Sequence, residues 1–298
     1  VINNEYGVSK TTKSKVLKSI KALDYNPNKA AQGLRSKKSF LIGLVYDNPD
    51  KFYSSDIQSG VLETCAKNGF SVVLFPCNHK EKDLTEKLIE FAKRTNLDGL
   101  ILTPPISDMK ELVKDLQLEI PLCVVSPGLL TSNPLCVSSD DFKATYSMTC
   151  HLIKQGHKKI GFIKGHKDHG ATQHRLDGYL NALSDNNIEI KQENITEGDF
   201  SFDSGEIAAK QLLKKGASKV TAIFASNDAM AAGVIKAAHK AKINIPNDIS
   251  LVGFDNSPTA SQAWPSITTI AQPIKEMASS AAQILIDNIS NKSEKKNV

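Results

Sequence analysis

Phe-Leu-Ile-Gly-Leu-Val-Tyr at residues 40–46 is a continuous apolar run of strand length. A helical pattern of apolar residues follows it and ends at Asn68-Gly69, a pair typical of a helix C-terminus. Short apolar strands that alternate with helices are typical of a parallel sheet covered by helices on both faces. This run therefore predicts the first strand of an α/β domain.

The same alternation then occurs in two successive parts of the chain. The first part has further strands expected at 70–75, 97–102 and 122–125, with helices near 83–94 and after Ser107. The second part has helices expected at 141–155, 175–183, 204–214 and 227–241, and strands at 159–163, 220–225 and 249–253. Neither a Gly-rich dinucleotide fingerprint nor a Gly-Lys-Ser/Thr phosphate loop is present. We expect an α/β protein with two doubly wound parallel-sheet lobes, a clamshell whose ligand lies between them.

The length and composition of the chain indicate a protein of more than one domain. A chain of 298 residues exceeds the usual size of one hydrophobic core, and 40% hydrophobic with 23% charged residues is ordinary for a soluble protein. No apolar run approaches the roughly 18 residues of a membrane span, and no signal peptide is recognisable, so we expect a cytoplasmic protein without a membrane partner. Five scattered cysteines, never in Cys-x-x-Cys spacing, lead us to expect no disulfide, no structural metal and no cofactor.

Charge is concentrated at the start of the chain. Residues 1–38 hold nine Lys/Arg and two acidic residues, a net charge of +7, whereas the whole chain carries +5. A basic head on a nearly neutral body is typical of nucleic-acid binding, because each neutralised phosphate releases counterions. The alternative is a solvated lysine-rich tail.

Order within the basic head favours DNA binding. A helix is expected from Ser9, an N-cap residue, with Val16, Leu17, Ile20 and Leu23 on one apolar face that needs partner helices. Residues 25–39 predict a second helix of barely two turns, in which an Asn-Pro pair supplies the start. A helix this short forms only when something packs against it, so we interpret this segment as a hinge.

These motifs match a known family. Val1-Ile-Asn-Asn4, Tyr25-Asn-Pro-Asn28 and Ala30-Ala-Gln-Gly-Leu34 resemble the end of the helix-turn-helix headpiece and the hinge helix of the lactose-repressor family of bacterial transcription regulators. The resemblance implies that paired hinge helices of a homodimer enter the minor groove of operator DNA, where Leu34 is a wedge between base steps. The alternative for Leu34 is a core leucine beneath the hinge. The implied DNA-binding residues are Asn28, Ala31, Gln32, Leu34 and Arg35.

The body of the chain resembles the effector-binding core of the same family. The motifs include Gly156-His-Lys-Lys-Ile160, Ile223-Phe-Ala-Ser-Asn-Asp228 and Asp248-Ile-Ser-Leu-Val-Gly-Phe-Asp255. The resemblance implies sugar-hydroxyl ligands at Arg175, Asn227 and Asp255, a stacking aromatic at Phe200, and a further contact at Gln272. It also implies that a last helix, about 274–289, returns to the first lobe.

The expected domains follow from these matches: a headpiece at 1–24, a hinge at 25–39, a first lobe at 40–139 plus about 273–298, and a second lobe at 140–272.

Polar and aromatic residues that follow predicted strands supply further candidates, because ligands bind outside the carboxyl ends of parallel strands. We add Phe52, Tyr53, Ser126 and Trp264 to the effector site. Trp264 has two open interpretations, a stacking face or a hydrophobic plug. Asn and Asp after strands are also ordinary helix caps, and Asp228 in particular is as well explained by a cap or fold role.

Enzymatic function is not expected. His166, His169 and His174 are expected in a Gly-rich loop without helical metal-ligand spacing, so we interpret them as pocket-rim residues. No nucleophile elbow is present. We predict a DNA-binding transcription regulator, a homodimeric repressor of carbohydrate-utilisation genes that binds operator DNA and a sugar-like effector. The alternative is a soluble sugar-binding transport protein without DNA binding.

Overall fold

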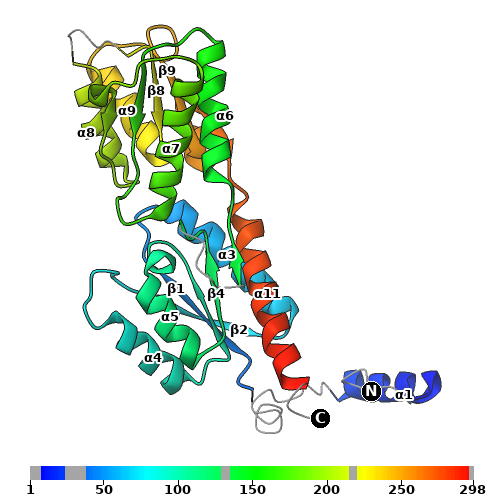
Figure 1. Cartoon of the computed structure of the whole chain (residues 1–298). Helices are drawn as coiled ribbons and strands as arrows, with labels where there is room; N and C mark the ends of the chain where they lie inside the picture. The colour runs from blue at the N-terminus through cyan, green and yellow to red at the C-terminus, as the bar shows by residue number, and fades with distance from the viewer. Residues whose placement is uncertain (1–7, 24–37, 129–134, 215–219, 295–298) are drawn as a thin grey trace. The chain divides into compact units, whose positions relative to one another are not determined.

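The computed structural model describes residues 8–23, 38–128, 135–214 and 220–294 (Figure 1). The chain separates into two units, residues 1–40 and 41–298. The hinge residues predicted to bind DNA, from Asn28 to Arg35, lie outside the described part of the chain.

Helix α1 (Lys10–Ala22) is the described element of the first unit. Its N-cap is Ser9, whose side chain accepts a hydrogen bond from the Thr12 backbone N–H at 3.2 Å, so the predicted helix and its cap are confirmed. None of the residues of α1 is buried, and Leu17 and Leu23 are exposed. The apolar face of α1 is therefore not buried by the described residues, and its packing against further helices stays a prediction.

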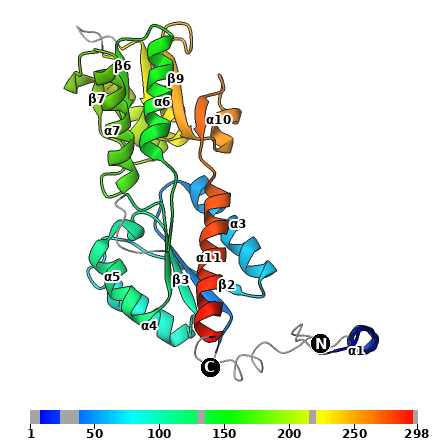
Figure 2. The ribbon, with the colours of Figure 1, turned by 45° about the vertical axis from the view of Figure 1, so that its right-hand side comes forward.

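The first lobe of the second unit is a parallel sheet with strand order β2-β1-β3-β4-β5. Its strands are β1 (Leu41–Tyr46), β2 (Ser71–Pro76), β3 (Gly99–Leu102), β4 (Leu122–Val125) and β5 (Cys136–Val137). Helices α3 and α11 pack together on one side of the sheet, and α4 and α5 lie on the other (Figures 1 and 2). They span α3 (Lys51–Lys67), α11 (Ile274–Glu294), α4 (Leu84–Thr95) and α5 (Lys110–Glu119), with the 3-10 turn η1 (Ile106–Asp108) before α5.

The second lobe repeats this arrangement, with strand order β10-β9-β8-β6-β7 and only parallel neighbours. Its strands are β6 (Ile160–Ile163), β7 (Ile195–Thr196), β8 (Ala222–Ala225), β9 (Ser250–Asp255) and β10 (Thr268–Ala271). Helix α6 packs on α7, and α8 packs on α9. These helices and the shorter ones are α6 (Asp141–Lys154), α7 (Gly170–Asp185), α8 (Phe202–Leu212), α9 (Asp228–Lys240), α10 (Pro258–Gln262) and η2 (Gln192–Asn194).

Counted along the chain, both sheets have the order 2-1-3-4-5. In such a sheet the ligand lies where the strand order reverses, beyond the carboxyl ends of the strands. Strands β1 and β6 stand at these positions, and both are almost completely buried because helices cover both faces. The predicted fold class is confirmed.

The chain crosses between the lobes at residues 138–140 and again at 272–273. After the second crossing α11 returns to the first lobe, as predicted, and packs against α3. The contact is close at Gly60, where an added Cβ would lie 2.3 Å from the Lys275 carbonyl oxygen.

The start of α7 differs from the prediction. The helix begins at Gly170 rather than near Arg175, so His169 is its N-cap and His174 lies within it. Gly170 is needed for close approach, because a Cβ there would lie 2.2 Å from the Gly128 Cα in the first lobe. The prediction of a Gly-rich loop through His174 is therefore wrong. From the sequence alone, Gly170 cannot be distinguished from a glycine in a loop.

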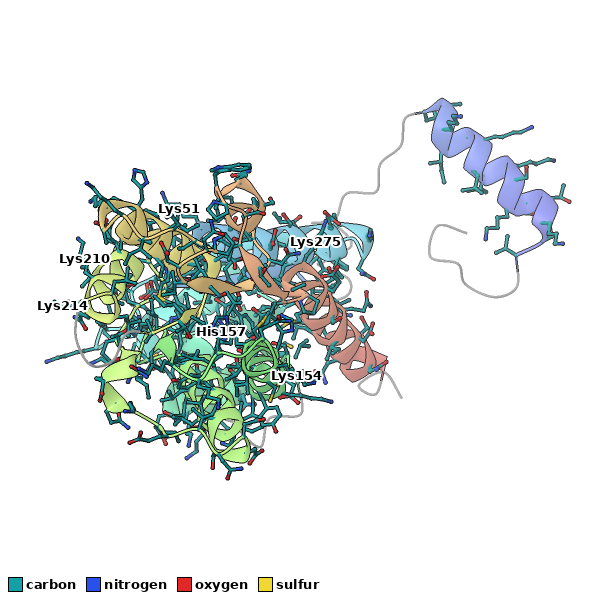
Figure 3. All side chains as sticks on the ribbon, turned by 90° about the horizontal axis from the view of Figure 1, so that it is seen from above. Lys51, Lys154, His157, Lys210, Lys214 and Lys275 are labelled. Carbon is teal, nitrogen blue, oxygen red and sulfur yellow. The ribbon has the colours of Figure 1, made fainter. Side chains whose placement is uncertain are left out.

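Charged side chains are distributed over the surface of residues 41–298. Lys51, Lys154, Lys210 and Lys275 belong to four different helices, α3, α6, α8 and α11 (Figure 3). Among the described residues, no helix is both long and apolar enough to cross a membrane.

Gly178 offers a test of the packing in the second lobe. An alanine in a helix is usually more stable than a glycine by about 1 kcal/mol. At Gly178, however, the added Cβ would lie 2.4 Å from the Phe142 carbonyl oxygen of α6. Gly178→Ala should therefore lower the free energy of unfolding by about 1 to 3 kcal/mol in urea titrations. Ser184→Ala, at an exposed position of the same helix, should change it by less than about 0.5 kcal/mol. A more stable Gly178→Ala protein would contradict the described packing.

Candidate functional site

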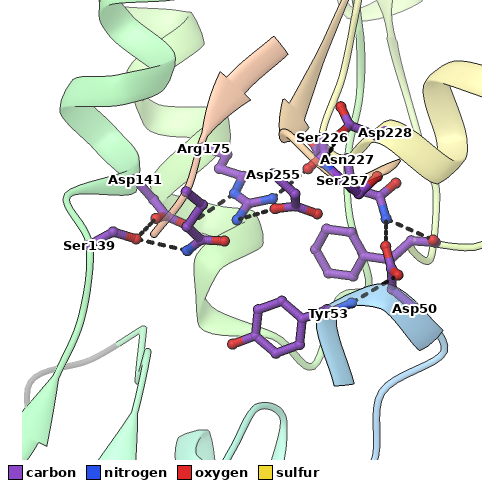
Figure 4. Close-up of polar contacts among 12 residues, drawn as sticks. Asp50, Tyr53, Ser139, Asp141, Arg175, Ser226, Asn227, Asp228, Asp255 and Ser257 are labelled. Carbon is purple, nitrogen blue, oxygen red and sulfur yellow. Dashed lines mark hydrogen bonds and ion pairs between the residues drawn. The ribbon is translucent and has the colours of Figure 1, made fainter. Parts of the chain in front are cut away.

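A cavity lies between the carboxyl ends of the two sheets. Both lobes contribute to its wall, and the lining residues are Asn48, Asp50, Tyr53, Pro104, Ser126, His169, Ala171, Arg175, Phe200, Asn227, Asp255 and Gln272. Figure 4 shows Asp50, Tyr53, Arg175, Asn227 and Asp255 of this set with their polar contacts. Seven of the nine residues predicted for the effector site are therefore brought together here. Six of them come from the segments that follow β1, β4, β6, β7, β8 and β10, and Asp255 is the last residue of β9.

The free volume of this central cavity is only about 30 Å³. That space holds one or two water molecules. Wider pockets adjoin it: one of about 410 Å³ shares Ser126 and Ala171 with it, and one of about 500 Å³ shares Asn48 and His169. A ligand of sugar size therefore does not fit the central cavity as it stands. Either the lobes or side chains move apart there, or the ligand extends into the adjoining pocket of about 410 Å³.

Arg175 is the central cation of the site and is almost fully buried. Its Nε donates to Asp141 Oδ2 at 3.0 Å, and one Nη lies 3.8 Å from Asp255 Oδ1. The other Nη donates to the Ser226 carbonyl oxygen, and the guanidinium carbon lies 3.6 Å from the centre of the Phe254 ring. These contacts fix the side chain and leave it facing the cavity.

Carboxylates outnumber the cation. Asp50 and Asp255 line the cavity and Asp141 lies directly behind Arg175, so three acids face one guanidinium. Burial raises the pKa of Asp255 well above its ordinary value, and the nearby Arg175 only partly offsets this effect. The site therefore favours a neutral ligand over an anionic one.

Several cavity residues have backbone conformations that side chains rarely adopt. The φ angles of Ser126, Phe200 and Asp255 are 47°, 69° and 106°, all in the left-handed region. Conformations of this kind cost of order 1 to 3 kcal/mol and cluster at ligand sites. Gly165 makes room for one of them, because a Cβ there would lie 2.0 Å from the Phe200 ring.

Three buried polar atoms around the cavity have no hydrogen-bond partner of ordinary geometry among the described residues, although the hydroxyls of Tyr53 and Ser126 lie close to each other. They are the hydroxyl of Tyr53, the hydroxyl of Ser126 and Oε1 of Gln272. A buried polar group without a partner is costly, so such groups usually bind water or a ligand. Burial also raises the pKa of the Tyr53 phenol, which keeps it a neutral donor.

Asn227 and Asp50 join the two lobes inside the cavity. Each is a helix N-cap: Asn227 Oδ1 accepts from the Met230 N–H at 2.9 Å, and Asp50 Oδ1 accepts from the Phe52 N–H at 2.9 Å. Asn227 Nδ2 also donates to Asp50 Oδ2 at 2.9 Å. The cap role and the site role therefore coexist in these residues. Asp228 instead accepts from the Ser257 N–H and the Thr269 hydroxyl within its own lobe, which is a fold role.

The sequence did not indicate Asp50 and Asp141 as residues of the site, and it gave His169 only as a pocket-rim residue. Asp50 and Asp141 stand at or beside helix N-termini, where acidic residues are common. An aspartate at such a position therefore does not by itself indicate a binding site. His169 is buried and packs edge-to-face on Phe200 with ring centres 5.1 Å apart. Burial lowers the pKa of His169 to about 3, so it is neutral at physiological pH.

Two predicted residues lie elsewhere. Phe52 is 42% exposed and does not line the cavity, because its neighbour Tyr53 takes the inward position on α3. Trp264 is 92% exposed and borders a surface groove with Ile235 and Ile245, so neither a stacking face in the cavity nor a buried plug describes it.

Two lobes of the same strand order that close on one polar cavity define a clamshell small-molecule-binding protein. A family model described as a periplasmic binding protein-like domain matches residues 149–298. The HTH-type transcriptional repressor PurR of Vibrio atlanticus is 31% identical over 306 residues, covering 100% of this chain and 89% of that protein. PurR of Photorhabdus laumondii is 33% identical over 300 residues, covering 99% and 86%.

Solved structures agree with these matches. The transcriptional regulator CelR in complex with cellobiose has a TM-score of 0.77 and 27% identity, covering 98% of this chain and 88% of that one. A LacI-family regulator from Enterococcus faecium with bound ribose has a TM-score of 0.73 and 26% identity, covering 84% and 90%. The chain belongs to the LacI family of DNA-binding transcriptional regulators. It is a repressor of this class and not an enzyme, as predicted, and the alternative of a transport protein is not supported.

Asp255→Asn tests the excess of carboxylates. A carboxyl group whose pKa is raised by folding contributes favourably while protonated, and this contribution is lost as pH rises through its folded-state pKa. Asp255→Asn should therefore raise the free energy of unfolding of the ligand-free protein near neutral pH, by on the order of 1 kcal/mol. The gain should shrink as the pH is lowered. Asp115→Asn, an exposed control on α5, should show neither effect. A loss of stability in Asp255→Asn at neutral pH would contradict the described electrostatics.

Proposed function

We propose that this repressor acts in the cytoplasm as a homodimer that controls carbohydrate-utilisation genes, with a neutral sugar or glycoside as the effector in the Arg175 cavity. The observation that carries the proposal is the composition of the cavity wall: one fixed guanidinium, an excess of carboxylates and three unpaired buried polar atoms. These groups suit a ligand rich in hydroxyls, each of which both donates and accepts hydrogen bonds.

The charge balance separates effector classes. A sugar phosphate would place its anion near Asp50 and Asp255, which oppose it, whereas a neutral polyol would offer hydroxyl donors to the same carboxylates. The Phe200 ring lines the cavity and provides an apolar face for a sugar ring. Cellobiose and ribose, which are bound to two structural relatives, are neutral sugars. A neutral nucleoside or base is the competing class.

A chain of hydrogen bonds runs from the effector site to both lobe connections. Asp141 accepts from Arg175 through one oxygen and from the Ser139 hydroxyl at 2.6 Å through the other. Gln272 Nε2 donates to the same Ser139 hydroxyl oxygen at 2.8 Å. Ser139 and Gln272 stand in the two crossings between the lobes. An effector that engages Arg175 thereby acts on the segments about which the lobes turn.

The regulatory step is a population shift. Effector binding favours one lobe angle, which changes how the hinge segments at 25–39 pair in the dimer and hence the affinity for operator DNA. Exposed apolar side chains on the first lobe support a second copy as partner: Leu62 on α3, Leu74 on the edge strand β2 and Ile284 on α11. The proposed DNA contacts remain those of the hinge, with Leu34 as the wedge.

Thermal unfolding against a panel of ligands tests the effector assignment. Neutral sugars, glycosides, nucleosides and sugar phosphates would be compared at millimolar concentration. A ligand at about 100 times its dissociation constant adds roughly 2.7 kcal/mol, which raises the melting temperature by several degrees. We expect at least one neutral sugar or glycoside to produce this rise, and sugar phosphates to produce none.

Two variants give the panel its controls. Asp255→Asn should abolish the rise, whereas Trp264→Phe, on the surface groove, should keep it. A response only to sugar phosphates, or a response lost in Trp264→Phe but kept in Asp255→Asn, would contradict the proposed site.

DNA binding tests the hinge assignment. The full-length protein would be used to select its own site from a randomised DNA pool, and affinities would then be measured by fluorescence anisotropy. Leu34→Ala should weaken specific binding by about tenfold or more, because the wedge repays part of the cost of unstacking the bases. Leu118→Ala, an exposed leucine on α5, is the matched control and should bind as the wild type does. Equal binding by the two variants would show that Leu34 is not a wedge.

A further inference from the structure

A cluster of titratable side chains joins the two lobes on one side of the cavity. Asp47 and His79 follow strands β1 and β2 of the first lobe, and His166 and Asp168 follow β6 of the second. We refer to these four residues as the interlobe histidine cluster. Three of them line the pocket of about 500 Å³ that adjoins the effector cavity, so an ion can enter from solvent.

Asp47 fixes the orientation of His79. Asp47 Oδ2 accepts from the His79 backbone N–H at 2.8 Å and lies 2.7 Å from the ring Nδ1. Nε2 lies 3.1 Å from Asp168 Oδ2 in the other lobe. Each ring nitrogen therefore faces a carboxylate oxygen, and a neutral imidazole can donate a proton to only one of them. With the proton on Nδ1, Nε2 and Asp168 Oδ2 are two electron-rich atoms that one cation would bind together.

His166 supplies a third donor. Its Nδ1 lies 3.9 Å from the same Asp168 oxygen and accepts the Asp168 backbone N–H at 3.2 Å, so this nitrogen carries a lone pair, and binding of an ion there would replace that hydrogen bond. The ligand atoms of His79, His166 and Asp168 all lie within 4.8 Å of one another. Ligands at zinc distances of about 2.0–2.2 Å in a tetrahedron are separated by roughly 3.4 Å, so small side-chain movements would bring the three into place.

We propose that His79, His166 and Asp168 bind a divalent transition-metal ion of the zinc type across the cleft. Two imidazoles and one carboxylate are a ligand set that suits such ions and not Mg²⁺ or Ca²⁺, which prefer oxygen donors. Asp47 holds His79 with its metal-binding nitrogen turned toward the other lobe. Water completes the coordination from the open pocket. Three carboxylates, those of Asp47, Asp168 and Asp199, lie near two lysines, Lys80 and Lys167, so the surroundings favour a cation.

The ion would hold the lobes in the closed arrangement, because its ligands come from both. Packed rings connect the cluster with the effector cavity: the ring centres of His79 and His166 are 5.6 Å apart, and those of His166 and His169 are 5.4 Å apart. His169 in turn packs on Phe200 in the cavity wall. Ion and effector should therefore increase each other's affinity. This coupling rests on the proposed effector site, whereas binding of the ion does not.

The test uses the whole chain and Zn²⁺ alone, after treatment with a chelator. Thermal unfolding should show a rise of several degrees at about 100 times the dissociation constant, and Mg²⁺ should produce none. Titration calorimetry should give one site, weakened at least tenfold in His79→Gln and in His166→Gln, and by about 10- to 100-fold in Asp47→Asn. The Co²⁺-loaded protein should show d–d absorption without a thiolate charge-transfer band, which separates this site from the five free cysteines.

His151→Gln is the matched control, since His151 is exposed on α6 in the second lobe. It should bind Zn²⁺ as the wild type does. Absence of a Zn²⁺ effect would overturn the proposal and leave a protonated His79 as the bridge between Asp47 and Asp168. An unchanged Zn²⁺ affinity in both His79→Gln and His166→Gln would also overturn it, because the ion would then be bound elsewhere.

Discussion

The buried guanidinium of Arg175 is the interaction on which the rest of the site depends. A charge in this position is stable only with close partners, and Asp141, Asp255, the Ser226 carbonyl and the Phe254 ring together provide them. These partners come from β8, β9 and α6, so the side chain fixes the carboxyl ends of several elements in relation to one another. The excess of acid that results makes the cavity receptive to neutral hydroxyl groups.

The same network explains how a small cavity can influence a whole lobe. Asp141 continues it to Ser139 and Gln272, which stand in the two crossings between the lobes. Two direct hydrogen bonds between the lobes add to this network. Asp50 accepts from the Asn227 side chain, and Asp108 accepts from the Gly170 N–H at 3.0 Å. The interlobe histidine cluster lies on the same cleft. Closure is therefore held by a few polar contacts, and the proposed effector and ion would change closure by adding to or replacing them.

Much of the fold could be predicted from the sequence. Apolar runs that alternate with helical patterns gave both parallel sheets, and the resemblance gave Arg175, Asn227, Phe200, Asp255 and Gln272 at the cavity. What could not be predicted depends on contacts between distant segments. Asp50 and Asp141 are unremarkable near helix starts until the lobes close over them, and His79 gains a role only when the second lobe brings Asp168 within 3.1 Å. Trp264 is the opposite case, since it was assigned to the effector site but is exposed on the protein surface. An aromatic residue type alone does not determine where the side chain lies.

Hydrogen–deuterium exchange with and without an effector tests the central claim most directly, because it locates the change in both lobes at once. The account predicts slower exchange in the first turn of α3 after Asp50, in the first turn of α9 after Asn227, and at the crossings near Ser139 and Gln272. Protection at both helix starts would establish that the effector closes the lobes on Arg175. Protection confined to one lobe, or to the groove beside Trp264, would contradict it.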